Sequence, residues 1–249
     1  MINIKSKDEI KRMRDAALIA IEAIDLMIKA VEPGISTLEL DDIAYRYIVS
    51  KGARPGFKGY GGFPGTACIS INEQIVHGIP DSRVLKEGDI VSFDTGAFLH
   101  GYHSDMARTV GVGRISKEAE RLIRLTEQSF WNGINYAVAG NRIHDISAGV
   151  EKVALENGLG IVREYTGHGL GTDLHEDPEV PNYTRRMRGP VLRPGLVICV
   201  EPMLTLGAED TILADNGWTA STSDGSLASH YENTIVITED GPCDIITIK

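Results

Sequence analysis

The chain has 249 residues, of which 42% are hydrophobic, so it can form one large domain or two small ones with a sizeable core. Its formal net charge of −10 argues against nucleic acid as the main partner, and no apolar run approaches the roughly 20 residues of a membrane span. Three widely spaced cysteines and the absence of a signal peptide predict a cytoplasmic protein without a disulfide framework.

Two helices are predicted before the first strands. The first begins with a capping box, in which Ser6 and Glu9 precede apolar residues at helical spacing. The second covers Ile35–Lys51, between two glycines. The same pair recurs in the second half, as a helix from near Ser116 and another over Asn141–Asn157. Because the period exceeds 100 residues, we expect one domain made of duplicated halves, at about 1–113 and 114–249.

A predicted strand in each half ends on a carboxylate. Segments 84–94 and 191–201 match in register at Val, Leu and Gly, and Asp94 falls opposite Glu201. Each segment is typical of a tight glycine turn followed by an apolar strand. An acid that closes such a strand is poorly suited to burial unless a positive group meets it. The repeat therefore predicts two half-domains that face one shared cation site.

Two further acids extend this set. Asp94 and Asp105 are predicted at neighbouring positions of an antiparallel strand pair joined by a short loop. Carboxylates so close repel each other unless a divalent cation lets both stay ionised, the alternative being that one of them pairs with Arg108. Glu232, at the start of a β-branched strand, is the predicted counterpart of Asp105. Four acids aimed at one place, with almost no nearby base, indicate a metal site.

Three histidines join the candidates. His168 stands between glycines, which leaves its imidazole accessible, whereas a structural role is an equal alternative for His77 and His175. Four carboxylates and one imidazole suit two adjacent divalent ions of the Mn, Fe or Co type better than a single structural zinc. The predicted chemistry is hydrolysis by a water shared between two ions, with a neighbouring carboxylate to accept its proton.

With these residues identified, the chain resembles the type I methionine aminopeptidases over nearly its whole length. The motifs that carry the resemblance are Asn72–Pro80, Asp94–Gly96, Ser104–Thr109, Gly167–Gly171 with His175–Pro178, Glu201–Met203 and Tyr231–Thr234. The resemblance implies an α+β pita-bread fold, which is a curved antiparallel sheet backed by helices in two pseudo-symmetric halves. It also implies removal of the N-terminal, initiator methionine from nascent proteins and peptides when the second residue is small.

The resemblance further implies a role for each metal-site residue. Asp94 would hold one of two divalent ions (Mn, Fe, Co or Zn), and His168 and Glu201 would hold the other. Asp105 and Glu232 would bridge the two ions. Glu201 would also accept the proton of the attacking water. The free α-amino group of the substrate would bind near the ion held by Asp94, which explains why the activity would be that of an exopeptidase.

Substrate recognition is implied in the same way. His77 and His175 would hydrogen-bond the scissile peptide and stabilise its oxyanion. The methionine side chain would lie near Tyr60, Phe63, Cys68 and Trp218. A thioether favours such soft and aromatic surroundings, although a plain core role is the alternative for these aromatics. The stretch 60–64 reads YGGFP where many relatives read YHGYP, and Leu174 stands where many bacterial relatives have Phe. We expect these departures to loosen the pocket or alter its depth, with a mild effect on selectivity for Met and none on the metal site.

The resemblance is to short, bacterial-style forms, and we expect a monomer. The acidic charge leaves room for a transient contact with the ribosome but predicts no direct binding of nucleic acid. One alternative is an X-Pro peptidase of the same fold, whose members usually carry a separate N-terminal domain. The other is a non-catalytic binding module of that fold, whose members generally lose metal ligands.

Overall fold

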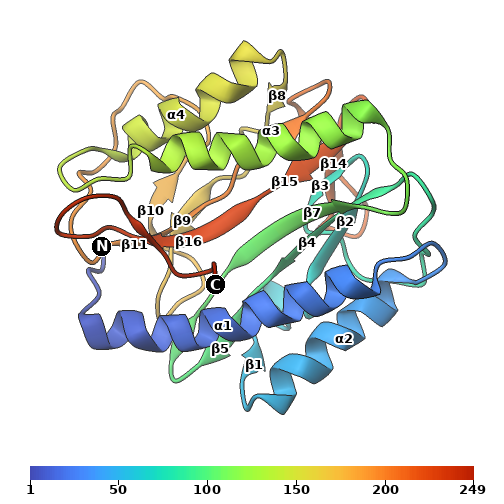
Figure 1. The fold of residues 1–249 in the computed structure, drawn as a ribbon, viewed down its shortest axis with the longest axis horizontal. Coiled ribbons are helices and arrows are strands. Elements are labelled where there is room, and N and C mark those ends of the chain that lie inside the picture. Colours follow the sequence, from blue (N-terminus) through green and yellow to red (C-terminus); the bar gives the residue numbers. More distant parts are fainter.

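The helices of this protein come in two pairs, one in each half of the chain. The structure is a computed structural model that describes residues 1–249. The helices are α1 (Lys7–Ala30), α2 (Thr37–Ser50), α3 (Lys117–Ile134) and α4 (Ile143–Glu156). The capping box predicted at Ser6 is present, and Ser36 provides a second one at the start of α2. In Figure 1, α1 and α2 lie along one side of the central strands, and α3 and α4 lie along the other.

An eight-stranded antiparallel sheet runs through both halves. Its order is β10-β9-β11-β16-β7-β4-β2, and β17 pairs with β16. The strands are β2 (Cys68–Ile71), β4 (Ile90–Thr95), β7 (Met106–Gly111), β9 (Gly167–Gly169), β10 (Glu176–Val180), β11 (Val197–Val200), β16 (Glu232–Val236) and β17 (Asp244–Ile245). At its centre β7 of the first half pairs with β16 of the second. The sheet is therefore continuous across the boundary between the halves.

Three small sheets flank the large one. The first consists of β1 (Arg54–Pro55), β5 (Ala97–Leu99) and β6 (Tyr102–His103). The second consists of β8 (Gly160–Ile161), β12 (Met203–Thr205) and β15 (Ala228–His230). The third consists of β3 (Gln74–Val76), β13 (Thr211–Leu213) and β14 (Ala220–Thr222). A short 3-10 helix, η1, covers Tyr60–Gly62. The segment between Asp94 and Asp105 is not the short loop we predicted. It forms the β5–β6 hairpin, whose turn places His100 and Gly101 at φ +53° and +85°, as tight hairpin turns require.

The two halves repeat each other in backbone contacts as well as in element order. The Gly34 N–H donates to the Leu85 carbonyl at 2.8 Å before α2. The Gly140 N–H donates to the Leu192 carbonyl at 3.0 Å before α4. Each of these contacts ties the start of a short helix to the turn before a strand, which is β4 with Asp94 in the first half and β11, followed by Glu201, in the second. The predicted repeat is therefore present in three dimensions.

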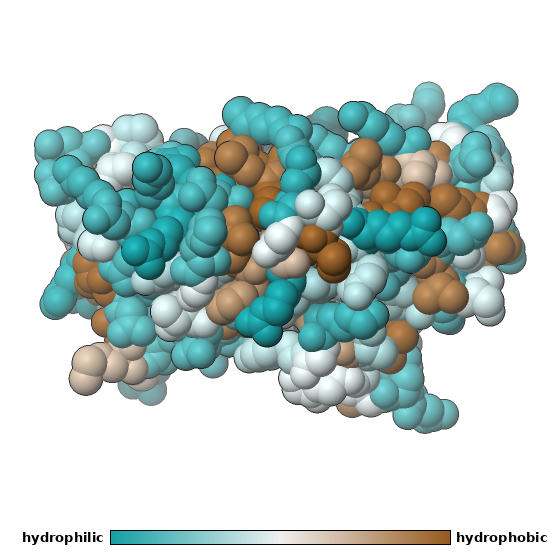
Figure 2. Space-filling view, turned by 90° about the horizontal axis from the view of Figure 1, so that it is seen from below, coloured by the Kyte–Doolittle hydropathy of each residue, from teal (hydrophilic) through white to brown (hydrophobic).

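The core is divided in the same way. One buried apolar cluster packs α3 and α4 against strands of the second half, and another packs α1 and α2 against β2 and β4. Figure 2 shows the face of the molecule below α1 and α2, where hydrophilic side chains predominate and hydrophobic ones form small groups between them. None of the helices combines the length and the apolar character that crossing a membrane requires.

Candidate metal centre

Three neighbouring strands position three of the acids. Ala107 of β7 pairs with Asp94 of β4 on one side and with Glu232 of β16 on the other. Residues that pair across an antiparallel sheet project from the same face, so both carboxylates lie beside Ala107. Asp105 stands two residues before Ala107, so the alternation of side chains along a strand brings it to the same face.

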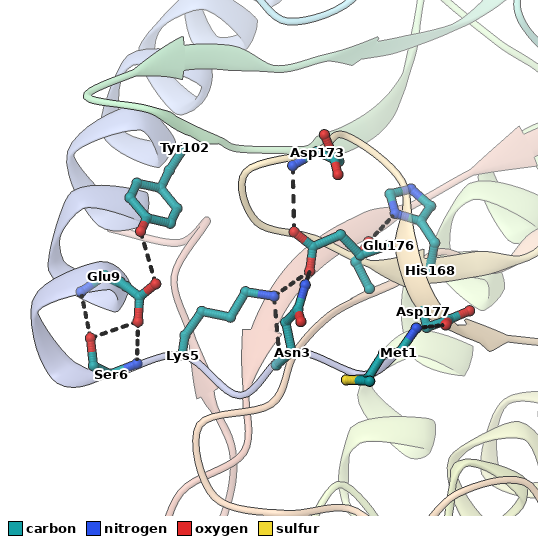
Figure 3. Close-up of polar contacts among 11 residues, drawn as sticks. Met1, Asn3, Lys5, Ser6, Glu9, Tyr102, His168, Asp173, Glu176 and Asp177 are labelled. Carbon is teal, nitrogen blue, oxygen red and sulfur yellow. Dashed lines mark hydrogen bonds and ion pairs between the residues drawn. The ribbon is translucent and has the colours of Figure 1, made fainter.

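The second half supplies a further acid and the imidazole. Glu201 directly follows β11, and His168 is the central residue of β9. The Nε2 atom of His168 lies 3.6 Å from Glu201 Oε1 and 3.7 Å from Asp105 Oδ2. Its Nδ1 donates to the carbonyl of Gly169 at 2.9 Å, because a carbonyl can only accept (Figure 3). The lone pair of Nε2 is therefore free to bind a cation.

The buried acids lack a positive partner. Burial, together with the charges of neighbouring acids, raises the pKa values of Asp94, Glu201 and Glu232 well above their usual range. Burial raises the pKa of Asp105 to about 7. The pKa of His168 falls to about 3, chiefly through burial, so its imidazole is neutral at pH 7. A cation is needed before all four acids can be ionised together.

Divalent metal ions fit this donor set. Buried oxygens of Asp94, Asp105 and Glu232 have no hydrogen-bond partner, which leaves strong acceptors unsatisfied. One ligand atom from each of four residues lies within 4.8 Å of the others: Asp105, His168, Cys199 and Glu232. Carboxylate and imidazole groups together suit ions of the Mn, Fe, Co or Zn type.

Arg108 and Cys199 do not replace the metal. The guanidinium of Arg108 donates to the Glu232 carbonyl and to Asn233 Oδ1, each at 2.6 Å, and no ion pair joins it to an aspartate. The alternative in which Arg108 neutralises one aspartate is therefore wrong. Cys199 is fully buried and is not among the residues that line the cavity. Burial and the charges of nearby carboxylates raise the pKa of its thiol well above the usual value.

Two further histidines border the same space. The rings of His168 and His175 meet edge to face at 4.3 Å, and the Tyr60 hydroxyl lies 2.8 Å from His175 Nδ1. Burial raises the pKa of Tyr60, so its hydroxyl keeps its proton and can donate to Nδ1. In that arrangement Nε2 of His175 carries the ring hydrogen. His77 has φ +59°, a strained conformation that is more common at functional sites than elsewhere.

A cavity of about 350 Å³ unites these groups. All eleven predicted site residues line it: Tyr60, Phe63, Cys68, His77, Asp94, Asp105, His168, His175, Glu201, Trp218 and Glu232. Phe63 and Trp218 meet edge to face at 5.2 Å, and Cys68 pairs across the strands with Asp94. Phe63 also belongs to a buried apolar cluster, so it serves the core and the cavity wall at once.

Sequence reasoning missed several residues at the site. Tyr165 lines the cavity and packs edge to face against His77 at 5.2 Å, and no motif in the sequence marks it. His230 is 2% exposed, and its Nε2 lies 3.8 Å from Glu201 Oε2. The sequence signal that could have identified His230 as a site residue is its position two residues before the predicted ligand Glu232.

The N-terminal arm, residues 1–6, packs against the segment that carries His175. Lys5 Nζ contacts Glu176 Oε2 at 2.5 Å, and both side chains are only 4% exposed (Figure 3). Asn3 donates to the same carboxylate at 3.2 Å. The α-amino group of Met1 lies 2.6 Å from Asp177 Oδ2, but that pair is exposed. The arm therefore fixes the residue that follows His175.

The fold and the site together define a metal-dependent hydrolase. Residues 11–239 match metallopeptidase family M24. The chain is 50% identical to a methionine aminopeptidase of Clostridium perfringens, over 100% of this chain and 99% of that one. The crystal structure of a methionine aminopeptidase from Rickettsia prowazekii superposes with a TM-score of 0.97 at 37% identity, covering 100% of both chains. A prolidase from Pyrococcus furiosus shares the fold, with a TM-score of 0.80 at 23% identity over 99% of this chain and 65% of its own.

The chain therefore belongs to metallopeptidase family M24, within its methionine aminopeptidases. The predicted pita-bread fold and the predicted class of enzyme, a metallo-aminopeptidase, are confirmed. The alternative of a non-catalytic module loses its basis, because no predicted ligand is missing from the cavity.

Proposed function

We propose that this chain removes N-terminal methionine with two divalent metal ions, held by Asp94, Asp105, His168, Glu201 and Glu232. The observation that carries the proposal is the convergence of these side chains, from both halves, on one cavity that aromatic side chains also line. When bound, the ions would acidify a water molecule and polarise the scissile carbonyl. Ligand atoms of Asp105 from the first half and Glu232 from the second lie within 4.8 Å of each other, which supports a bridging role.

Glu201 is suited to accept the proton of the attacking water. Only one of its oxygens, Oε1, faces His168, so Oε2 remains for proton transfer. Burial raises the affinity of this carboxylate for a proton, which a general base needs if it is to compete with water. His77 and His175 would then contact the substrate carbonyl, and Tyr60 favours the tautomer in which His175 Nε2 donates.

The substrate assignment follows from the two walls of the cavity. The α-amino group of the substrate would bind, as the neutral amine, near the ion that Asp94 would hold, which restricts cleavage to the first peptide bond. Phe63, Cys68 and Trp218 offer the thioether a soft, largely apolar surface. Burial raises the pKa of the Cys68 thiol well above its usual value, so this wall carries no thiolate. We include in the proposal that a small second residue is required.

We extend the proposal to the oligomeric state, the domain organisation and the cellular location of the protein. It acts as a monomer with one catalytic domain, in the cytoplasm, and touches the ribosome transiently at most. Its three cysteines are free, as expected in a reducing compartment, and its net charge of −10 argues against a lasting contact with RNA.

The test compares peptides on chelator-stripped protein before and after Mn or Co is added back. We expect metal-dependent release of Met from Met-Ala-Ser, about 10–200-fold faster than release of Leu from Leu-Ala-Ser. Ala-Pro-Ala is the control for the X-Pro alternative and should remain intact. Preferential cleavage of Ala-Pro-Ala, or no cleavage of any peptide with metal bound, would contradict the proposal.

A further inference from the structure

His230 is a buried histidine whose ring nitrogen Nε2 has no hydrogen-bond partner. It is the last residue of β15, it is 2% exposed, and its Nε2 makes no hydrogen bond. Nearly all buried polar atoms in proteins are hydrogen-bonded, and leaving one unpaired is costly. An orphaned nitrogen beside a catalytic cavity therefore needs an explanation.

The backbone of His230 is held firmly from a neighbouring strand. Its N–H donates to Thr109 Oγ1 at 3.0 Å, and the Thr109 hydroxyl donates to its carbonyl at 2.8 Å. In addition, His230 pairs with Met203 across β15 and β12. Because both main-chain groups are fixed and the side chain is buried, the imidazole has little room to turn away from the site.

Glu201 lies between two imidazoles. Its Oε1 is 3.6 Å from Nε2 of His168, and its Oε2 is 3.8 Å from Nε2 of His230. The oxygen that faces His168 is on the side of the metal ligands, so the oxygen assigned to proton transfer faces His230. A shift of about 1 Å would bring Oε2 and the His230 nitrogen to hydrogen-bond distance.

We propose that His230 is a positioning residue, whose Nε2–H donates to Glu201 Oε2 and holds this carboxylate in the orientation for metal binding and proton transfer. The inference rests on the proposed function for the role of Glu201, but the contact itself does not. Partners of this kind, behind a metal ligand, typically contribute 10–100-fold to metal affinity or activity.

The test uses His230→Leu, which removes the donor, and His230→Gln, whose amide can replace it. His144→Leu is the matched control, because His144 also has a buried nitrogen without a partner but lies outside the cavity. Circular dichroism and thermal unfolding establish that each variant folds. The readouts are kcat and KM for Met-Ala-Ser, and the Kd for Mn measured calorimetrically on chelator-stripped protein.

For His230→Leu we expect kcat to fall and the Kd for Mn to rise by about 10–100-fold, with KM nearly unchanged. His230→Gln should recover most of both losses, and His144→Leu should match the wild type. The inference is overturned if His230→Leu matches His144→Leu, or if folded His230→Gln is as impaired as His230→Leu. Failure of the wild type to release Met would instead contradict the proposed function, while the Mn affinities would still test the contact.

Discussion

Asp94→Asn is expected to lower metal-dependent release of Met by about 10³-fold, because a neutral amide is a far weaker ligand than a carboxylate. The side chain keeps its shape, so the strand pairing of Asp94 with Ala107 and Cys68 should survive. Steady-state kinetics on Met-Ala-Ser with added Mn measures the loss. Retention of full activity would refute the assignment of Asp94 as a metal ligand.

The same variant should gain stability when no metal is present. Burial and the charges of Asp105 and Glu232 disfavour the ionised form of Asp94, as its raised pKa shows. Removing one of four crowded acids relieves this repulsion, so metal-free Asp94→Asn should unfold at a higher temperature than metal-free wild type. Added Mn should raise the midpoint of the wild type more than that of the variant, which retains the ligands of the second ion. Asp177→Asn, which changes an exposed aspartate, is the control and should resemble the wild type.

Lys5→Met is expected to destabilise the protein by about 3 kcal/mol, because it leaves the Glu176 carboxylate buried without its partner. For a protein of this size the thermal midpoint should fall by about 6–12 °C. The double variant Lys5→Met/Glu176→Met should recover much of this loss, since it removes both charges. Asp177→Asn breaks only the exposed pair with Met1 and should change the midpoint little. Equal effects of the buried and exposed pairs would refute this account of the N-terminal arm.

The contribution of Glu176 has a defined pH dependence. Burial acts to raise its pKa, but the hydrogen bond and charge of Lys5 outweigh burial, so the net pKa is lowered. An acid whose pKa is lower in the folded state stabilises the fold above its unfolded pKa of about 4.3. This stabilisation is lost as pH falls through the lower, folded value. The stability difference between wild type and Glu176→Gln should therefore be full at pH 7 and shrink below about pH 4.

Much of the architecture could be predicted because the same order of helices and strands occurs in both halves of the sequence. The match between segments 84–94 and 191–201 predicted strands that end at Asp94 and Glu201, and the structure brings both to one cavity. Local signals also sufficed for the start of α1, where Ser6 and Glu9 satisfy the free N–H groups of a helix end. These predictions depend only on neighbours in sequence or on the repeat.

Contacts that are set by tertiary packing could not be predicted. Lys5 and Glu176 are an unremarkable pair of charges in the sequence, and only the fold brings the N-terminal arm to β10. Tyr60 was predicted for the methionine pocket, yet its hydroxyl contacts His175, because η1 places it at the cavity edge. The role of His230 depends on the distance to one oxygen of Glu201, which no pattern along the chain specifies.

In the proposed metal centre, side chains from both halves of the chain hold two divalent ions. Calorimetric titration of chelator-stripped wild type with Mn, beside His168→Ala, tests this arrangement most directly. We predict two bound ions for the wild type and the loss of one of them in folded His168→Ala. A wild type that binds no ion, or a folded His168→Ala that binds two ions as tightly as the wild type, would contradict the account.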